Sequence, residues 1–173
     1  MTILKSLFIV LALSLISSPL YADKLLDLKK AQKQEVTASM IGFRNTLLFY
    51  TFKDQKAILV LSIDNKDETF PVTGKVYLFD ESANEEALAK WINNQHSDGL
   101  YPDIPEPIAT VELPKETCKV SSHKQTGTSE NPGPVGGEVK DYEVNITIKA
   151  FESKKKFKLS AFKETTKVHI IQK

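Results

Sequence analysis

The residues best suited to chemistry in this chain follow a predicted helix near its middle. The apolar stripe of that helix includes Trp91, and the segment after it places acids and a tyrosine close to a histidine. A histidine beside an acid can transfer a proton, and acids beside aromatic rings suit recognition of a sugar or a peptide. The candidate ligand-binding residues are Trp91, His96, Asp98, Tyr101 and Asp103.

The same residues also have a purely structural interpretation. A histidine at a helix C-terminus interacts favourably with the helix dipole, Trp91 would fix the helix to a sheet, and Tyr101-Pro102 is typical of a turn. Because both interpretations fit the sequence, we assign no catalytic residue. A small hydrolase or glycan-active enzyme that uses His96, Asp98 and Asp103 is the alternative function.

Motifs for phosphate, serine-nucleophile and metal chemistry do not occur in the sequence. It has neither GxGxxG nor GxxxxGK[ST], and it has no GxSxG. A zinc site requires three or four closely spaced ligands, whereas His96, His123 and His169 are far apart in the sequence. We therefore expect no metal site and no cofactor.

The first 22 residues have the pattern of a secretory signal peptide. Lys5 precedes an apolar run that ends near Ser17, Pro19 interrupts it, and Ala22 supplies the small residue that signal peptidase requires. The run is shorter than the roughly 20 residues of a membrane span, and no cysteine follows it to carry a lipid. We expect an exported, soluble chain, periplasmic or secreted, without a stable membrane anchor after cleavage near Ala22.

Cysteine usage and charge restrict the function further. The single cysteine, Cys118, rules out an internal disulfide, so the fold depends on burial. We expect Cys118 to be buried, the alternative being a reactive or intermolecular thiol. Lys and Arg number 23 and Asp and Glu 22. Removing Lys5 leaves 22 against 22, and a net charge of zero argues against nucleic-acid binding.

Hydrophobic periodicity predicts a single, mainly β domain over residues 23–173. The segment Ala57–Ile63 is apolar on both faces, as in a central strand, and Tyr142–Ala150 alternates as in a half-buried strand. One helix starts with a capping box of Ser82 and Glu85. We expect an antiparallel β-sandwich with one inserted α-helix, and a closed β-barrel is the alternative.

Three further segments have local patterns of their own. Asp23–Gln34 has the spacing of a short, weakly amphipathic helix, and a frayed terminus is an equal alternative. Arg44-Asn45 suits a tight turn between two strands. Residues 123–138 are rich in Gly, Pro and polar side chains, which predicts a mobile loop. Deleting Thr126–Gly137 should therefore leave the fold intact.

These observations favour a non-enzymatic binding or envelope-assembly module with a protein or carbohydrate partner that the sequence does not identify. Besides the enzyme named above, a carrier of an apolar ligand is a second alternative. It rests on the aromatic-rich segment Leu47–Phe52, which core packing explains equally well.

Overall fold

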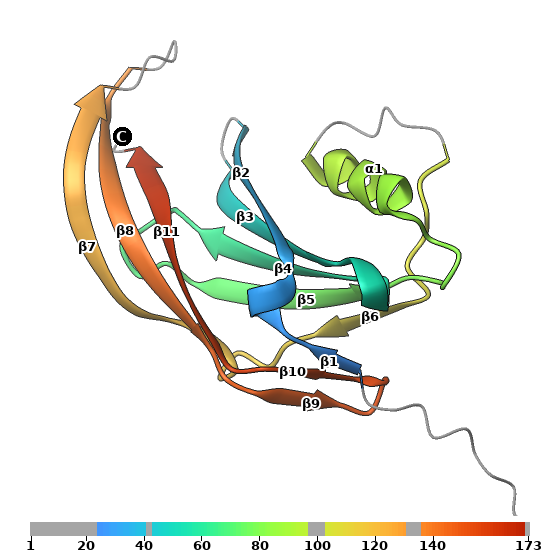
Figure 1. Cartoon of the computed structure of the whole chain (residues 1–173). Coiled ribbons are helices and arrows are strands. Elements are labelled where there is room, and N and C mark those ends of the chain that lie inside the picture. The colour runs from blue at the N-terminus through green and yellow to red at the C-terminus, as the bar shows by residue number, and fades with distance from the viewer. Residues whose placement is uncertain (1–23, 41–42, 97–102, 131–135, 172–173) are drawn as a thin grey trace, which may run out of the picture.

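The computed structural model describes residues 24–40, 43–96, 103–130 and 136–171, and the predicted leader lies outside them. Figure 1 shows the strands and the helix in order along the chain. The elements are β1 (Lys24–Leu26), β2 (Gln32–Met40), β3 (Phe43–Phe52), β4 (Ala57–Asp64), β5 (Val72–Leu78), α1 (Glu85–His96), β6 (Ala109–Glu112), β7 (Cys118–Glu130), β8 (Glu138–Ile148), β9 (Phe151–Ser153), β10 (Phe157–Leu159) and β11 (Phe162–Ile171), with short 3-10 turns at Leu28–Lys30 and Lys53–Gln55.

A five-stranded antiparallel sheet of order β2-β3-β4-β5-β6 forms the middle layer. Its central strand β4 is apolar on both faces. Leu59 and Leu61 belong to the core on one side of the sheet, and Ile58 belongs to the core on the other side. The predicted central strand at Ala57–Ile63 is therefore confirmed.

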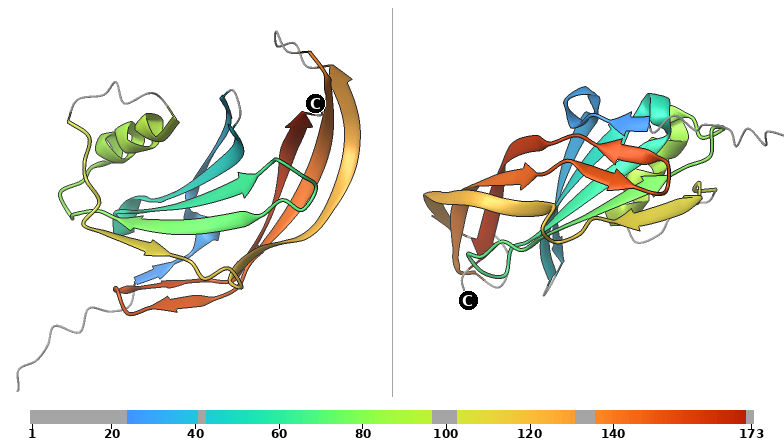
Figure 2. Two further views of the ribbon diagram at one scale, coloured as in Figure 1. Left: turned by 180° about the vertical axis from the view of Figure 1, so that it is seen from behind. Right: turned by 90° about the horizontal axis from the view of Figure 1, so that it is seen from below.

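Two three-stranded sheets, β11-β8-β7 and β1-β10-β9, lie along one face of the middle sheet. Strand β8 continues into β9, and β10 into β11, so together they form one bent layer (Figure 2). Strand β1 runs parallel to β10, whereas the other pairs are antiparallel. No sheet built from the described strands closes on itself, so the barrel alternative is wrong and the fold is a β-sandwich with one inserted helix.

Two apolar cores hold these layers together. The larger core lies between the sheets, draws on residues from Leu26 to Ile170, and includes Cys118, which is 3% exposed as the sequence predicted. The smaller core lies under α1, where Leu88 and Trp91 pack with Phe49 of the middle sheet. In the described part of the chain, no helix has the length and apolar character needed to cross a bilayer.

The helix begins two residues later than its predicted capping box implies. The Ala87 N–H donates to Asn84 Oδ1 at 2.8 Å, so Asn84 is the N-cap. Ser82 lies in the preceding turn, where its N–H donates to the Asp80 carboxylate. Because asparagine and serine both accept well at this position, the sequence did not distinguish them.

Two local predictions near the N-terminus are wrong. Most of the segment Asp23–Gln34 forms β1, a 3-10 turn and the start of β2 instead of a helix, because Leu26 is fully buried in pairing with Leu159. A weak helical preference is readily overridden by such packing. The pair Arg44-Asn45 does not form a turn between strands. It lies inside β3, which starts at Phe43, whereas β2 ends at Met40.

The predicted loop at 123–138 is wrong for residues 123–130. These residues extend β7, which pairs with β8 as far as Glu130 opposite Glu138. Their side chains are mostly exposed, so main-chain pairing, with little burial, forms this half of the strand. A hydrophobic pattern cannot reveal a strand of that kind. Residues 131–135 lie outside the described part of the chain.

Candidate functional site

Trp91, the first of the five predicted ligand-binding residues, lies in the core under α1. Its ring centroid is 4.5 Å from that of Tyr77 and 5.5 Å from that of Phe79. Only 5% of the residue is exposed. This position makes Trp91 the main contact between the helix and the sheet and leaves little of its ring for a ligand.

The other four predicted residues lie at or beyond the end of α1. Asp103 is exposed and has a left-handed φ of 59°. The pKa of Lys90 is raised, chiefly by its hydrogen bond to Glu86 and to a smaller extent by the nearby Asp103 carboxylate. The side chain of His96, and the whole of Asp98 and Tyr101, lie outside the described residues. The cluster as a whole therefore stays a prediction.

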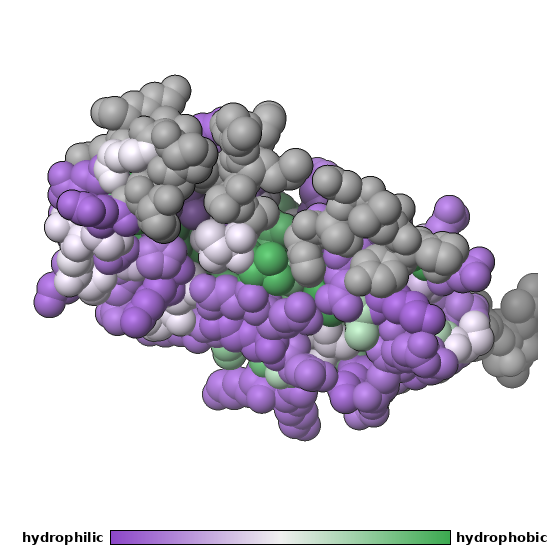
Figure 3. Space-filling view, turned by 90° about the horizontal axis from the view of Figure 1, so that it is seen from above, coloured by the Kyte–Doolittle hydropathy of each residue, from purple (hydrophilic) through white to green (hydrophobic). Residues whose placement is uncertain are grey.

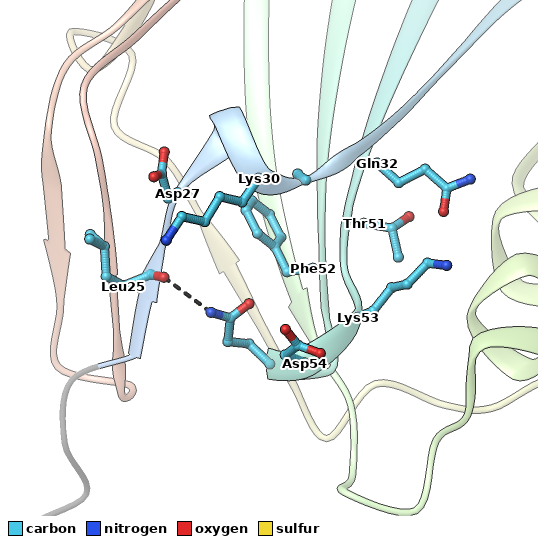
Figure 4. A pocket seen from close by; sticks show the side chains of 10 residues that line it. Leu25, Asp27, Lys30, Gln32, Thr51, Phe52, Lys53 and Asp54 are labelled. Carbon is cyan, nitrogen blue, oxygen red and sulfur yellow. Dashed lines mark hydrogen bonds between the residues drawn. The ribbon is translucent and has the colours of Figure 1, made fainter.

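Two adjoining hollows lie at the start of β2. The larger, of about 460 Å³, lies between β1 and the end of β3 (Figure 4). The smaller, of about 320 Å³, lies between β2 and α1. They share Gln32, Thr51 and Lys53, and we call them together the β2 groove. Other residues that line it include Asp27, Lys30, Gln34, Phe52, Glu85 and Glu86.

Most of the residues that line the β2 groove have polar side chains, although polar and apolar atoms contribute about equally to its surface. Gln55 Nε2 donates to the Leu25 carbonyl at 3.3 Å. Lys53 Nζ lies 2.5 Å from Glu85 Oε2, which links the 3-10 turn after β3 to the helix. No group of three or more His, Cys, Asp or Glu residues in the described ranges could hold a metal ion. The amide, hydroxyl and charged side chains of the groove can form hydrogen bonds with a polar chain.

The strand beside this groove, β2, is an edge strand with a regular ladder. All nine of its residues pair with β3 without a shift, from Gln32 opposite Thr51 to Met40 opposite Phe43. On its other side β2 pairs with no other described strand. Alternate residues of an antiparallel strand direct their N–H and C=O groups away from the partner. Strand β2 therefore presents a free row of main-chain donors and acceptors.

A polar cluster occupies the side of β2 that faces β11. Lys33 Nζ lies 2.6 Å from Glu164 Oε1 and 3.6 Å from Glu35 Oε2, and Thr166 Oγ1 donates to Glu35 Oε2 at 2.9 Å. We call Lys33, Glu35, Glu164 and Thr166 the edge cluster. It contains one cation and two carboxylates, so its formal charge is −1.

Tyr50 lies beneath the edge cluster and is 1% exposed. Burial, followed by the charge of Glu164, raises the pKa of its hydroxyl far above the ordinary value. The Tyr50 hydroxyl makes no hydrogen bond of good geometry within the described residues, although Glu164 is close enough to raise its pKa by charge and by a weak hydrogen-bonding contact. The cluster thus covers a buried phenol and holds it in the protonated state.

An apolar strip lies on the opposite face of β2, the face that α1 partly covers. Val36, Leu47 and Val60 are half-buried there and pack against the core under the helix. Val36 pairs with Leu47, and Val60 pairs with the buried Phe49, so the strip crosses β2, β3 and β4. Seen from above, apolar surface gathers at the middle of the molecule within polar surroundings (Figure 3).

A second polar and aromatic cluster attaches the β4–β5 connection to β7 and β8. Tyr142 donates to Glu68 Oε1 at 2.5 Å, and Lys140 Nζ lies 3.2 Å from the same oxygen. Phe70, 1% exposed, packs edge-on against His123 and Tyr142 at 5.2 Å from each ring. Burial and the Glu68 hydrogen bond raise the pKa of Tyr142 to about 12. These contacts join residues of the chain to one another, which indicates that the cluster has a structural role.

Sequence reasoning missed the β2 groove because a helix was expected over Asp23–Gln34, where β1, a 3-10 turn and the start of β2 form. Gln32, Lys33, Gln34 and Glu35 are all polar, so no polar–apolar alternation marked the start of this strand. The chain matches no protein-family model, no curated protein and no solved structure. The function must therefore be argued from this site alone.

Proposed function

We propose that the chain is a non-enzymatic binding module that acts outside the cytoplasm, and that the β2 groove with the free edge of β2 is its recognition surface. The observation that carries this proposal is a regular nine-residue edge strand bordered by two hollows of about 460 and 320 Å³. Binding and assembly modules commonly use such edges because main-chain hydrogen bonds supply affinity without catalytic groups.

Export is part of the same proposal. Residues 1–22 have the pattern of a cleavable leader, with the cleavage site before Asp23. The residues after the leader would form one domain, since the larger core joins Leu26 to Ile170. The intact mass of the protein from its own compartment should correspond to a chain that begins at Asp23; a chain that keeps residues 1–22 would contradict this.

The groove favours a polypeptide partner over a carbohydrate. Its lining offers amide, hydroxyl and charged groups, and the aromatic ring that lines it, Phe52, is 3% exposed. Sugar sites generally need an exposed aromatic face, whereas a polypeptide can use the free main chain of β2.

Site-specific photocrosslinking tests the recognition surface. A photoreactive residue replaces Gln34, which lines the groove, and in a matched variant it replaces Lys167 on the opposite, outer face of the bent layer. Irradiation in the native compartment should give a discrete adduct from position 34 and none from position 167. Identical adducts from both positions, or none from position 34, would show that the groove is not the binding surface.

A further inference from the structure

The chemistry on the two faces of β2 identifies the kind of polypeptide that would bind there. We propose that β2 accepts an extended peptide as an added strand, with apolar side chains on the α1 side and a lysine or arginine on the β11 side. This inference rests on the proposed function and adds the binding mode and the ligand class.

The main chain of β2 is the first element of the argument. Added strands pair through main-chain hydrogen bonds, which require a continuous edge without bulges or proline. Strand β2 contains no proline and keeps one register along its length. By contrast, β7 has two register shifts, between Val120 and Ser122 and between Gln125 and Gly127. Such bulges protect an edge from further pairing.

The α1 side of β2 determines one face of the ligand. In a strand added beside β2, every second side chain would lie on the same face of the sheet as Val36 and its partner Leu47. These two residues and Val60 are half-buried, so a further row of apolar side chains would complete their burial. At the other end of the strand the same face meets Gln34 and Glu86 of the groove.

The β11 side determines the other face of the ligand. The remaining side chains of an added strand would lie over Lys33 and Glu35, beside Glu164. Glu35 and Glu164 carry two negative charges and Lys33 carries one positive charge, so the three side chains together have a formal charge of −1. A lysine or arginine in the ligand would neutralise that excess, whereas an acidic residue would meet two carboxylates.

The edge strand β11 is the nearest competitor. It is also regular, with ten residues paired to β8. Its outward-facing side chains include Lys163 and Lys167, so a ligand there would meet cations. An apolar ligand with one cation suits β2 and not β11.

A capped nonapeptide of sequence Thr-Val-Thr-Val-Lys-Val-Thr-Val-Thr provides the probe. Its valines occupy one face of a strand and its lysine the other. Dissociation constants are measured by fluorescence anisotropy for this peptide, for a rearranged peptide with the four valines contiguous, and for two N-methylated forms. One form is methylated on all the valines, and the other on the central lysine and the two threonines nearest to it.

Strand addition predicts that the two N-methylated peptides bind differently, because alternate residues of a strand direct their N–H groups to opposite sides. Methylation of the residues whose N–H groups point toward β2 should weaken binding at least tenfold more than methylation of the alternate set, and rearrangement should also weaken it tenfold. Hydrogen exchange should slow in β2 amides and not in those of β11. Equal effects of the two methylated forms, protection of β11 instead, or no binding of the alternating peptide would overturn the proposal.

Variants of the full mature chain test where on the protein surface the peptide binds. Val36→Lys should weaken binding at least tenfold, whereas Ile108→Lys, at a residue that is 69% exposed beside the other edge of the sheet, should not change it. Glu35→Gln should reduce the preference for the lysine peptide over its glutamate analogue. Equal binding by the Val36 and Ile108 variants, with matching thermal melts, would contradict the site. If the peptide fails while photocrosslinking at position 34 still captures a partner, strand addition is wrong and the recognition surface stands.

Discussion

Lys33 of β2 and Glu164 of β11 join the two layers of the sandwich through an ion pair between their edge strands. Their charged atoms are 2.6 Å apart, although 131 residues separate them in the sequence. On the opposite side the chain itself passes from β6 in the middle sheet to β7 in the bent layer. The chain also passes between the layers on the β2 side, from β1 through Leu28–Lys30 into β2. The edge cluster therefore adds a side-chain link between the layers next to the proposed binding surface.

The Lys33–Glu164 pair should contribute measurably to stability. The Glu164 side chain is 13% exposed and that of Lys33 is 33% exposed, so solvent screens the pair only in part. A double-mutant cycle with Lys33→Met and Glu164→Gln, followed by urea unfolding, should give a coupling free energy of about 1 kcal/mol. The coupling should fall when salt is raised to about 1 M, where the screening length is about 3 Å.

The exposed pair Lys75–Glu112 serves as the control. Its atoms are 2.8 Å apart, but its side chains are 46% and 73% exposed. Because solvent screens this pair almost fully, the same kind of cycle should give a clearly smaller coupling free energy than that of Lys33–Glu164. A coupling at Lys33–Glu164 no larger than that of Lys75–Glu112 would show that the edge cluster does not hold the layers together.

Tyr50→Phe should stabilise the protein. The buried Tyr50 hydroxyl makes no hydrogen bond of good geometry in the described structure, so removing it relieves a desolvation cost and loses only a weak contact with Glu164. We expect the free energy of unfolding to rise by about 1 kcal/mol. The measurement is urea unfolding at pH 7, with Tyr142→Phe as the matched variant, which loses the bond to Glu68 and should be destabilised by about 1 kcal/mol. A loss of stability in Tyr50→Phe would mean that its hydroxyl makes a bond to Glu164.

Stability should decline on the alkaline side. Burial raises the pKa of Cys118 from 9.0 to about 12, and burial with the Glu68 bond raises that of Tyr142 from 10.0 to about 12. From about pH 9 for the thiol, and from about pH 10 for the phenol, the unfolded chain releases protons that the folded chain keeps. The free energy of unfolding must therefore decrease as pH rises toward about 12.

Denaturant unfolding at about pH 8, 10 and 11 measures this decline. Cys118→Ala and Tyr142→Phe each remove one titrating group. Between the lowest and the highest of these pH values, the free energy of unfolding of each variant should fall less than that of the unsubstituted protein. This comparison holds whatever the stability of each variant at the lowest pH. A flat pH profile for the unsubstituted protein would contradict the protonated, buried state of these groups.

The parts of the fold that bury apolar side chains were predictable from the sequence. The alternation around Val144 and Ile146, the doubly apolar β4 and the stripe of α1 all follow from burial, and all were confirmed. The fold class follows from the same signal. Hydrophobic periodicity predicts these positions correctly because the burial of each side chain depends on the face of its own strand or helix on which it lies.

The parts that depend on pairing between distant segments were not predictable. Leu26 is buried only because β1 meets β10, and the outer half of β7 is a strand only because β8 lies beside it. The β2 groove needs β1, β3 and α1 to come together, and no local pattern specifies that meeting. Of the predicted site, Trp91 was misleading because large aromatic residues serve cores and ligand sites alike.

Deletion of Thr126–Gly137 should still leave a folded protein, although part of the segment is a strand. Gln125 lies opposite Tyr142, so joining Gln125 to Glu138 leaves a connection of four residues, 138–141. Of the residues displaced, Val139 is buried, and its loss costs about 2 kcal/mol. Circular dichroism should show a cooperative melt at a lower temperature. Leu26→Ala, which empties a fully buried position, should cost about 3 kcal/mol and is the comparison. A deletion variant that melts without cooperativity would show that the outer half of β7 is required for the fold.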